Sequence, residues 1–143
     1  MTDDPVLLTG AGGRVGRAIL EGVGDAHEWR LLDREPIRTG RLPDPVADAE
    51  RIVGDVTDEE TVRAAVRGTK AVVHLAGDPR PEAPWESVLT NNVDGTQTVF
   101  EAAAEAGVDR VAFASSNHAV GAYETPERTP EMYRPEGDLL LDG

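Results

Sequence analysis

The sequence predicts an α/β fold built on a doubly wound parallel sheet. Two observations lead to this class. Short apolar runs alternate with helical patterns along most of the chain, and a glycine-rich turn at 10–16 joins the first apolar run directly to the first helical pattern. Because crossovers between parallel strands are right-handed, five such strands take the order 3-2-1-4-5.

The N-terminal elements follow from periodicity and turn residues. Apolar runs predict strands at 6–9, 29–33 and 51–54. A helix is expected at 14–23, with Val15, Ile19 and Leu20 on one face. Three prolines in the segment 35–50 are too many for a helix, so this segment is expected to be a loop with at most a turn.

The later elements are predicted in the same way. The sequence Thr57-Asp-Glu-Glu60 fits the capped start of a helix that runs to Val66, and apolar runs predict strands at 71–75 and 110–114. The longest helix is expected at 86–106, where Gly107 ends it. Beyond Gly121 the pattern dissolves. The expected organisation is a folded domain at 1–121 and a proline-rich tail at 122–143, which is either a long surface loop or a segment that packs on something not present.

Composition limits the classes of function. The net charge is −13, from 27 acids and 14 bases, so nucleic acid is a poor partner. No apolar stretch approaches the ~20 residues of a membrane span, and there is no secretory signal pattern, so a cytoplasmic protein without a membrane partner is expected. Without cysteine there is neither a disulfide nor a thiolate metal site, and no metal is expected.

Lysine is nearly absent, because Lys70 is the only one. An acidic chain with arginine in place of lysine is typical of halophilic proteins from a salt-loaded cytoplasm, where screening reduces self-repulsion. The alternative is an acidic protein from a GC-rich genome, which also favours arginine.

The glycine-rich turn carries the first functional signal. Gly10, Gly13 and Gly16 fit the spacing G-x-x-G-x-x-G of a Rossmann-type sheet. Gly10 allows a tight turn, Gly13 leaves no Cβ between backbone and phosphate, and Gly16 lets the helix lie close to the sheet. The helix that opens with Arg14 and Val15 directs its free N–H groups at an anion, so a dinucleotide pyrophosphate is expected here. The alternative is a glycine-rich turn without a ligand.

Further candidates follow the other strands. Asp33 can accept hydrogen bonds from both ribose hydroxyls and repels a 2′-phosphate, which favours NAD over NADP, whereas the adjacent Arg34 weakens this preference. The alternative for Asp33 is a solvated carboxylate. Asp55 and Val56 can contact an adenine, and the backbone of Leu75, Ala76 and Gly77 can approach the cofactor closely.

Six segments together carry a family resemblance: T-G-A-G-G-R-V-G at 9–16, Asp33, G-D-V at 54–56, H-L-A-G at 74–77, N-N-V-D-G-T at 91–96 and S-S-N-H-A-V-G at 115–121. In this order they resemble the extended short-chain dehydrogenase/reductase superfamily of NAD-dependent epimerases and dehydratases. The S-S-N-H run resembles uronate dehydrogenases and their sugar-phosphate-oxidising relatives. The resemblance implies NAD as cofactor.

The resemblance also implies roles for single residues. Ser116 corresponds to the catalytic serine, whose hydroxyl hydrogen-bonds the sugar oxygen. Asn117 and His118 match substrate-contacting positions, although His118 could merely cap the strand end. Asn91 matches a position that touches the nicotinamide ribose, and Asn92 heads the helix signature or makes a structural hydrogen bond to the neighbouring strand.

The family's reaction needs a pair that this sequence lacks. Members use a tyrosine as base four residues before a lysine, but here Tyr123 is followed at that spacing by Glu127 and Tyr133 by Gly137. The resemblance therefore implies the NAD-binding half of an enzyme, with a sheet truncated before its later strands and a tail that is an incomplete continuation of the same domain. The complete enzyme would oxidise a uronic acid or sugar phosphate at the anomeric carbon to a lactone and would be dimeric, and this half would be inactive alone. The alternatives are a sugar-nucleotide epimerase or dehydratase and a non-catalytic NAD-binding protein.

Overall fold

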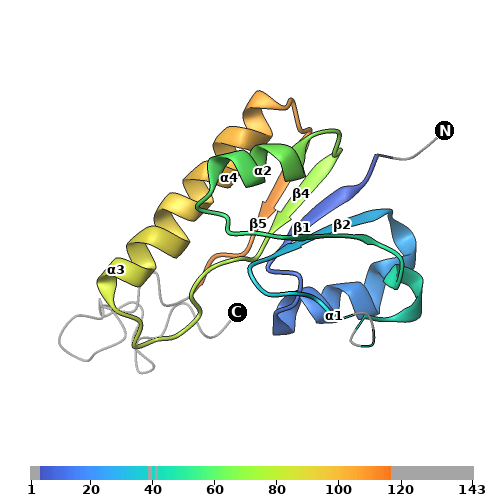
Figure 1. Cartoon of the computed structure of the whole chain (residues 1–143), viewed down its shortest axis with the longest axis horizontal. Coiled ribbons are helices and arrows are strands. Elements are labelled where there is room, and N and C mark those ends of the chain that lie inside the picture. Colours follow the sequence, from blue (N-terminus) through green and yellow to red (C-terminus); the bar gives the residue numbers. More distant parts are fainter. Residues whose placement is uncertain (1–3, 39, 41, 117–143) are drawn as a thin grey trace, which may run out of the picture.

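The computed structural model describes residues 4–38, 40 and 42–116. In this part of the chain, five parallel strands form one sheet in the order β3-β2-β1-β4-β5 (Figure 1). The strands are β1 Val6–Thr9, β2 Trp29–Asp33, β3 Glu50–Val53, β4 Ala71–His74 and β5 Arg110–Phe113. The predicted fold class and strand order are confirmed, and each strand lies within one residue of its expected bounds. The expected tail at 122–143 lies outside the described residues.

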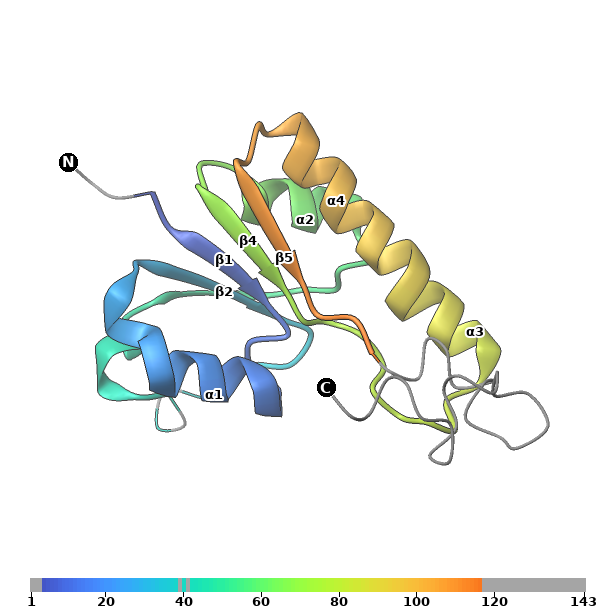
Figure 2. The same cartoon turned by 180° about the vertical axis from the view of Figure 1, so that it is seen from behind.

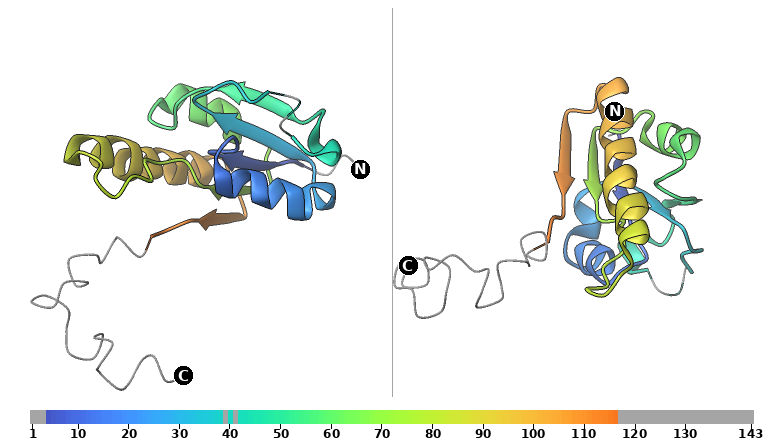
Figure 3. Two further views of the ribbon diagram at one scale, coloured as in Figure 1. Left: turned by 90° about the horizontal axis from the view of Figure 1, so that it is seen from below. Right: turned by 90° about the vertical axis from the view of Figure 1, so that its left-hand side faces the viewer.

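Helices cover the two faces of the sheet unequally. α1 Arg14–Val23 lies on one face, and α2 Glu59–Val66 and α4 Gly95–Glu105 lie on the other (Figures 1 and 2). The segments α3 Trp85–Ser87 and η4 Val88–Asp94 lead directly into α4. Figure 3 shows β4 and β5 without a described helix on the face that α1 covers elsewhere. No described helix is long and apolar enough to span a membrane.

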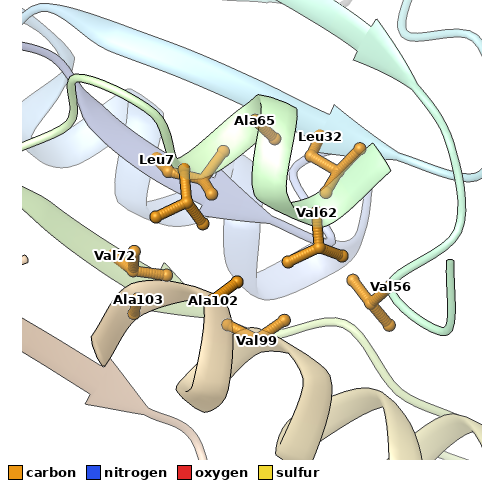
Figure 4. Close-up of a cluster of buried hydrophobic side chains, with 10 residues drawn as sticks. Leu7, Leu32, Val56, Val62, Ala65, Val72, Val99, Ala102 and Ala103 are labelled. Carbon is orange, nitrogen blue, oxygen red and sulfur yellow. The ribbon is translucent and has the colours of Figure 1, made fainter. Parts of the chain in front are cut away.

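The core divides between the two faces because neighbouring residues of a strand point to opposite sides. Leu7 and Leu32 pack with Val62 of α2 and Val99 of α4 in one cluster (Figure 4). On the other face, strand residues such as Leu8 pack with Leu20 of α1 and with Val46 of the 3₁₀ turn η3 Asp44–Val46. The Trp29 indole N–H donates to the Gly24 carbonyl in the 3₁₀ turn η1 Gly24–Ala26. The two clusters pack against opposite faces of the sheet and together hold the carboxyl ends of β1, β2 and β4 side by side.

Two local expectations about helices need correction. The cap of α2 is Asp58 rather than Thr57, because the Asp58 carboxylate accepts the N–H groups of Glu60 (3.1 Å) and Thr61 (3.5 Å). Thr57 instead donates its N–H and its hydroxyl to Asp55, both at 2.9 Å. Val15 does not share a buried face with the core residues of α1, since 57% of its surface is exposed.

The long helix expected at 86–106 contains a π-helical segment, Val88–Asp94. Directly after this segment, Gly95 packs closely against the loop that follows β3, since a Cβ on Gly95 would lie 2.9 Å from Val56 Cγ2. Apolar periodicity does not distinguish this segment from an ordinary helix, although π-helical turns are frequent at functional sites.

Candidate functional site

A cavity of about 540 Å³ opens at the carboxyl ends of β1, β2 and β4. It gathers candidates that follow β1, β2, β3 and β4, namely Gly10, Gly13, Arg14, Val15, Gly16, Asp33, Asp55, Val56, Leu75, Ala76 and Gly77. Its remaining lining residues are Leu32, Arg34, Gly54 and Pro79. The candidates Asn91, Asn92 and Ser116 are not among the lining residues. Val15 therefore belongs to the cavity wall, which explains its exposure.

Close backbone packing explains two of the three glycines. Gly10 has φ +68°, and a Cβ there would lie 2.8 Å from the Ala76 backbone nitrogen. A Cβ on Gly16 would lie 2.7 Å from the Gly10 carbonyl oxygen. The turn after β1 is thus pressed between β4 and α1, which fixes the floor of the cavity.

The first turn of α1 gives the cavity an anion-binding character. Gly13 is the N-cap, no side chain caps the helix, and the first turn contains no acid. The uncapped N–H groups carry the positive end of the helix dipole, and they lie where Gly13, Arg14 and Val15 line the cavity. This wall is suited to a phosphate or pyrophosphate.

Asp33 and Arg34 stand at the end of β2, and their side chains are engaged differently. The Asp33 carboxylate accepts N–H groups from Gly12 at 2.9 Å and from Glu35 at 3.1 Å. Arg34 donates through Nη2 to Asn91 Oδ1 at 2.9 Å. Arg34 therefore joins the end of β2 to the π-helical segment across the sheet edge, while the carboxylate stays at the cavity wall.

The two asparagines of the π-helical segment organise the loop that follows β4. Asn92 Oδ1 accepts the Asp78 N–H at 2.6 Å, and Asn92 Nδ2 donates to the Asp78 carbonyl at 3.1 Å. Asn91 Nδ2 donates to Ser87, both to its carbonyl oxygen (2.9 Å) and to its hydroxyl (3.1 Å). The partner of Asn92 is thus the loop after β4, and not the neighbouring strand that the structural alternative named.

Asp78, in the loop after β4, belongs to none of the motifs in the sequence. Its side chain is only 7% exposed, and its carboxylate accepts Arg80 Nε at 2.8 Å, Arg80 Nη2 at 2.5 Å and the Ser87 hydroxyl at 2.6 Å. The Arg80 guanidinium and the Ser87 hydroxyl hold the pKa of this carboxyl far below its usual range. The signal available in the sequence was an acid two residues before an arginine, which is too common to identify such a site.

The catalytic and substrate-contacting candidates lie at or beyond the C-terminal end of the part of the chain that the structure describes. Ser116 is exposed and follows β5, on the side of the sheet where the cavity opens. The substrate-contacting candidates Asn117 and His118 lie outside the described residues. Among the described residues, no group of histidine and acidic side chains is arranged to hold a metal ion.

Comparison with known proteins identifies the family. The model of the NAD-dependent epimerase/dehydratase family matches residues 6–137. NAD-dependent glucose-6-phosphate dehydrogenase of Haloferax volcanii is 66% identical over 141 residues, covering 99% of this chain and 54% of that enzyme. Uronate dehydrogenase of Pseudomonas putida is 38% identical over 132 residues, covering 90% of this chain and 47% of that enzyme. The chain thus spans about half the length of these relatives.

A solved structure gives the same picture. A mutant uronate dehydrogenase from Agrobacterium tumefaciens in complex with NAD superposes with a TM-score of 0.70 at 36% identity, covering 80% of this chain and 42% of that chain. The fold class, the resemblance to uronate and sugar-phosphate dehydrogenases and the expected cofactor, NAD, are confirmed by these matches. The chain belongs to the NAD-dependent epimerase/dehydratase family.

Proposed function

We propose that this chain binds NAD in the cavity at the carboxyl ends of β1, β2 and β4, as the cofactor half of an NAD-dependent sugar dehydrogenase. The observation that carries the proposal is the convergence of the glycine turn, Asp33 and the backbone of Leu75, Ala76 and Gly77 on one cavity of about 540 Å³. Dinucleotides bind at this place in parallel sheets, outside the strand ends where the strand order reverses.

Each part of the cofactor has a matching wall. The N–H groups at the start of α1 suit the pyrophosphate, and Asp33 suits the hydroxyls of the adenosine ribose. Asp55 and Val56 suit the adenine, because they pair a carboxylate with an apolar surface. The nicotinamide then extends past Gly77 toward Ser116, whose hydroxyl would hydrogen-bond the reacting sugar oxygen.

The proposed reaction is oxidation of a cyclic sugar at its anomeric carbon to a lactone, with hydride transfer to NAD. Among uronic acids and sugar phosphates we favour a sugar phosphate, because the Haloferax relative at 66% identity is a glucose-6-phosphate dehydrogenase. Asn117 and His118 are the proposed substrate contacts. Haloferax relatives also support the proposal of an acidic protein of a salt-loaded cytoplasm.

We further propose that these 143 residues bind the cofactor without turnover, because the sequence contains no tyrosine four residues before a lysine. A phenol near its reference pKa of ~10 is a poor base at neutral pH. For the complete enzyme we propose a homodimer, as the family resemblance implies.

Calorimetric titration of the 143-residue chain in high salt tests the binding proposal. NAD is expected to bind with a stoichiometry of one and more tightly than NADP, because Asp33 repels a 2′-phosphate. Absence of NAD binding by the folded chain would overturn the proposal. NADH absorbance after addition of glucose 6-phosphate or glucuronate tests the second part, and its appearance would contradict the lack of turnover.

A further inference from the structure

We infer that His74 is a positioning residue of the dinucleotide site: it accepts the proton of the Thr9 hydroxyl and thereby orients that hydroxyl to hold the cavity wall at Leu75 and Ala76. The inference deepens the proposed function and rests on it for its consequence in binding. The hydrogen-bond arrangement itself can be tested without cofactor.

Thr9, His74 and Thr96 form a hydrogen-bonded chain through the centre of the fold. Thr9 and His74 are both fully buried, at 0% exposure. Thr9 Oγ1 lies 2.7 Å from His74 Nδ1, and His74 Nε2 lies 3.1 Å from Thr96 Oγ1. The chain therefore joins the last residue of β1 to the last residue of β4 and to the second residue of α4.

The positions of the protons follow from the partners of Thr9. Its hydroxyl oxygen accepts the N–H groups of Leu75 and Ala76, each at 3.2 Å, and the Leu75 N–H is shared with the Thr9 carbonyl. A hydroxyl has one proton and two lone pairs, so with both lone pairs engaged its proton points to His74 Nδ1. His74 is then the neutral tautomer that carries its proton on Nε2 and donates to Thr96.

This arrangement reaches the cavity directly. Leu75 and Ala76 line it, and the Ala76 nitrogen is the atom that a Cβ on Gly10 would approach to 2.8 Å. Thr9 precedes Gly10, so one hydroxyl fixes both the start of the glycine turn and the backbone that the turn packs against. A displacement of this wall would alter the space for the cofactor as well as the packing of the turn.

Burial keeps the ring in the form that the chain requires. Desolvation lowers the pKa of His74 to about 4, so the ring is neutral at physiological pH and Nδ1 can accept. A protonated ring would donate at both nitrogens, and Thr9 could no longer offer both lone pairs to the cavity wall. Phe113 stacks on the ring with centroids 5.7 Å apart, which limits its rotation.

The decisive comparison is between two buried threonines. Thr9→Val removes the hydroxyl with little change of shape, and Thr69→Val does the same to a threonine that is 8% exposed and whose hydroxyl donates to the Val66 carbonyl away from the cavity. At a temperature where both variants are folded, Thr9→Val is expected to weaken NAD binding by roughly tenfold or more, and Thr69→Val by less than about twofold. Equal affinities in the two variants would overturn the inference.

Two substitutions of His74 distinguish the effect of its hydrogen-bond acceptor from the effect of its volume. His74→Asn can place Oδ1 near the position of Nδ1 and is expected to retain most of the NAD affinity. His74→Phe keeps a ring against Phe113 but removes the acceptor, so it is expected to bind as weakly as Thr9→Val. If His74→Phe binds NAD as the unmodified chain does, the acceptor role is wrong.

Two measurements on the free protein decide the arrangement independently of NAD. Nitrogen-15 spectra of the imidazole should show the proton of His74 on Nε2, and a proton on Nδ1 would overturn the inference. The Ala76 amide should exchange with solvent faster in Thr9→Val than in Thr69→Val, and equal rates would also overturn it. If the unmodified chain failed to bind NAD, the proposed function would fall while these two measurements still decided the role of His74.

Discussion

The Asp33 carboxylate accepts the Gly12 backbone N–H at 2.9 Å, which joins the acid at the end of β2 to the glycine turn that precedes α1. A second backbone N–H, from Glu35, binds its other oxygen at 3.1 Å. The carboxylate is therefore held in place by two backbone groups, and its remaining acceptor capacity faces the cavity. This arrangement suits the recognition of ribose hydroxyls by a preorganised charge.

Asp33→Asn should weaken NAD binding by roughly tenfold or more, because hydrogen bonds to a charged acceptor are worth about 1.5–3 kcal/mol. The preference for NAD over NADP should shrink as well, since the repulsion of a 2′-phosphate is lost. Calorimetric titration with both dinucleotides measures the two effects. The control is Glu35→Gln, which changes the net charge by the same amount two residues further along the chain. It should leave both affinities nearly unchanged. Equal losses in the two variants would contradict a specific role for Asp33.

Gly10→Ala should destabilise the fold and abolish NAD binding, and Gly68→Ala is its matched control. Both glycines have positive φ, +68° and +72°, but only a Cβ on Gly10 meets backbone atoms, because nothing lies within 4 Å of one on Gly68. The left-handed backbone costs an alanine roughly 1–2 kcal/mol in either place. Gly10→Ala should lose about 1–3 kcal/mol more in urea unfolding. Similar losses in the two variants would contradict the close contact with Ala76.

Stability should fall in acid as His74 becomes protonated. Burial lowers its pKa from 6.5 to about 4, so the folded state favours the neutral ring. This contribution is complete above pH 6.5 and is lost as the pH falls toward 4, by about 3 kcal/mol in total. Urea unfolding at pH 7 and pH 4.5 measures the change, which His74→Asn should reduce. His27→Gln is the control, because it shows how much of the pH dependence of stability is lost when any imidazole is removed. An unchanged pH dependence in His74→Asn would contradict the prediction.

The sequence predicted the sheet and most of the cavity wall because those features depend on local chemistry. Buried strands between helical patterns define the parallel sheet, and the glycine spacing allows few backbone arrangements other than a tight strand-to-helix turn. Once the strand order 3-2-1-4-5 follows from handedness, Asp33, Asp55 and the segment 75–77 must lie at one edge. Their convergence on one cavity is a consequence of topology rather than of side-chain detail.

Other features depend on contacts between distant residues and had no local signal. The Thr9–His74 hydrogen bond joins residues that are 65 positions apart, and the Asn92–Asp78 pair depends on the π-helical segment that turns the asparagine toward the loop. Val15 illustrates the same limit. Its spacing from Leu20 suggests a shared buried face, but the first turn of α1 projects past the sheet and exposes the side chain to the cavity.

Asn92→Asp should destabilise the loop after β4 although it changes only one side-chain atom. Asn92 Nδ2 donates to the Asp78 carbonyl, and a carboxylate would replace this donor by a charged acceptor beside another acid. The expected loss is about 1–3 kcal/mol in thermal or urea unfolding. Asn91→Asp is the comparison, because it also loses a side-chain donor, here to Ser87, but its oxygen accepts from Arg34 and a charge there would strengthen that bond and offset part of the loss. If Asn91→Asp destabilised the fold more than Asn92→Asp, the prediction would be contradicted.

Potassium chloride should stabilise the fold, because the net charge of −13 makes repulsion between acids the dominant surface term. Raising the salt from 0.1 M to 1 M shortens the screening length from about 10 Å to about 3 Å. The exposed pairs of Arg63 with Glu59 and Glu105 weaken at the same time, but such pairs contribute only about 0–1 kcal/mol each. Neutralising the exposed acids Glu28, Asp48 and Asp109 as amides should raise the urea midpoint in 0.1 M salt and reduce the gain from added salt. A midpoint that falls with salt would show that ion pairing outweighs repulsion.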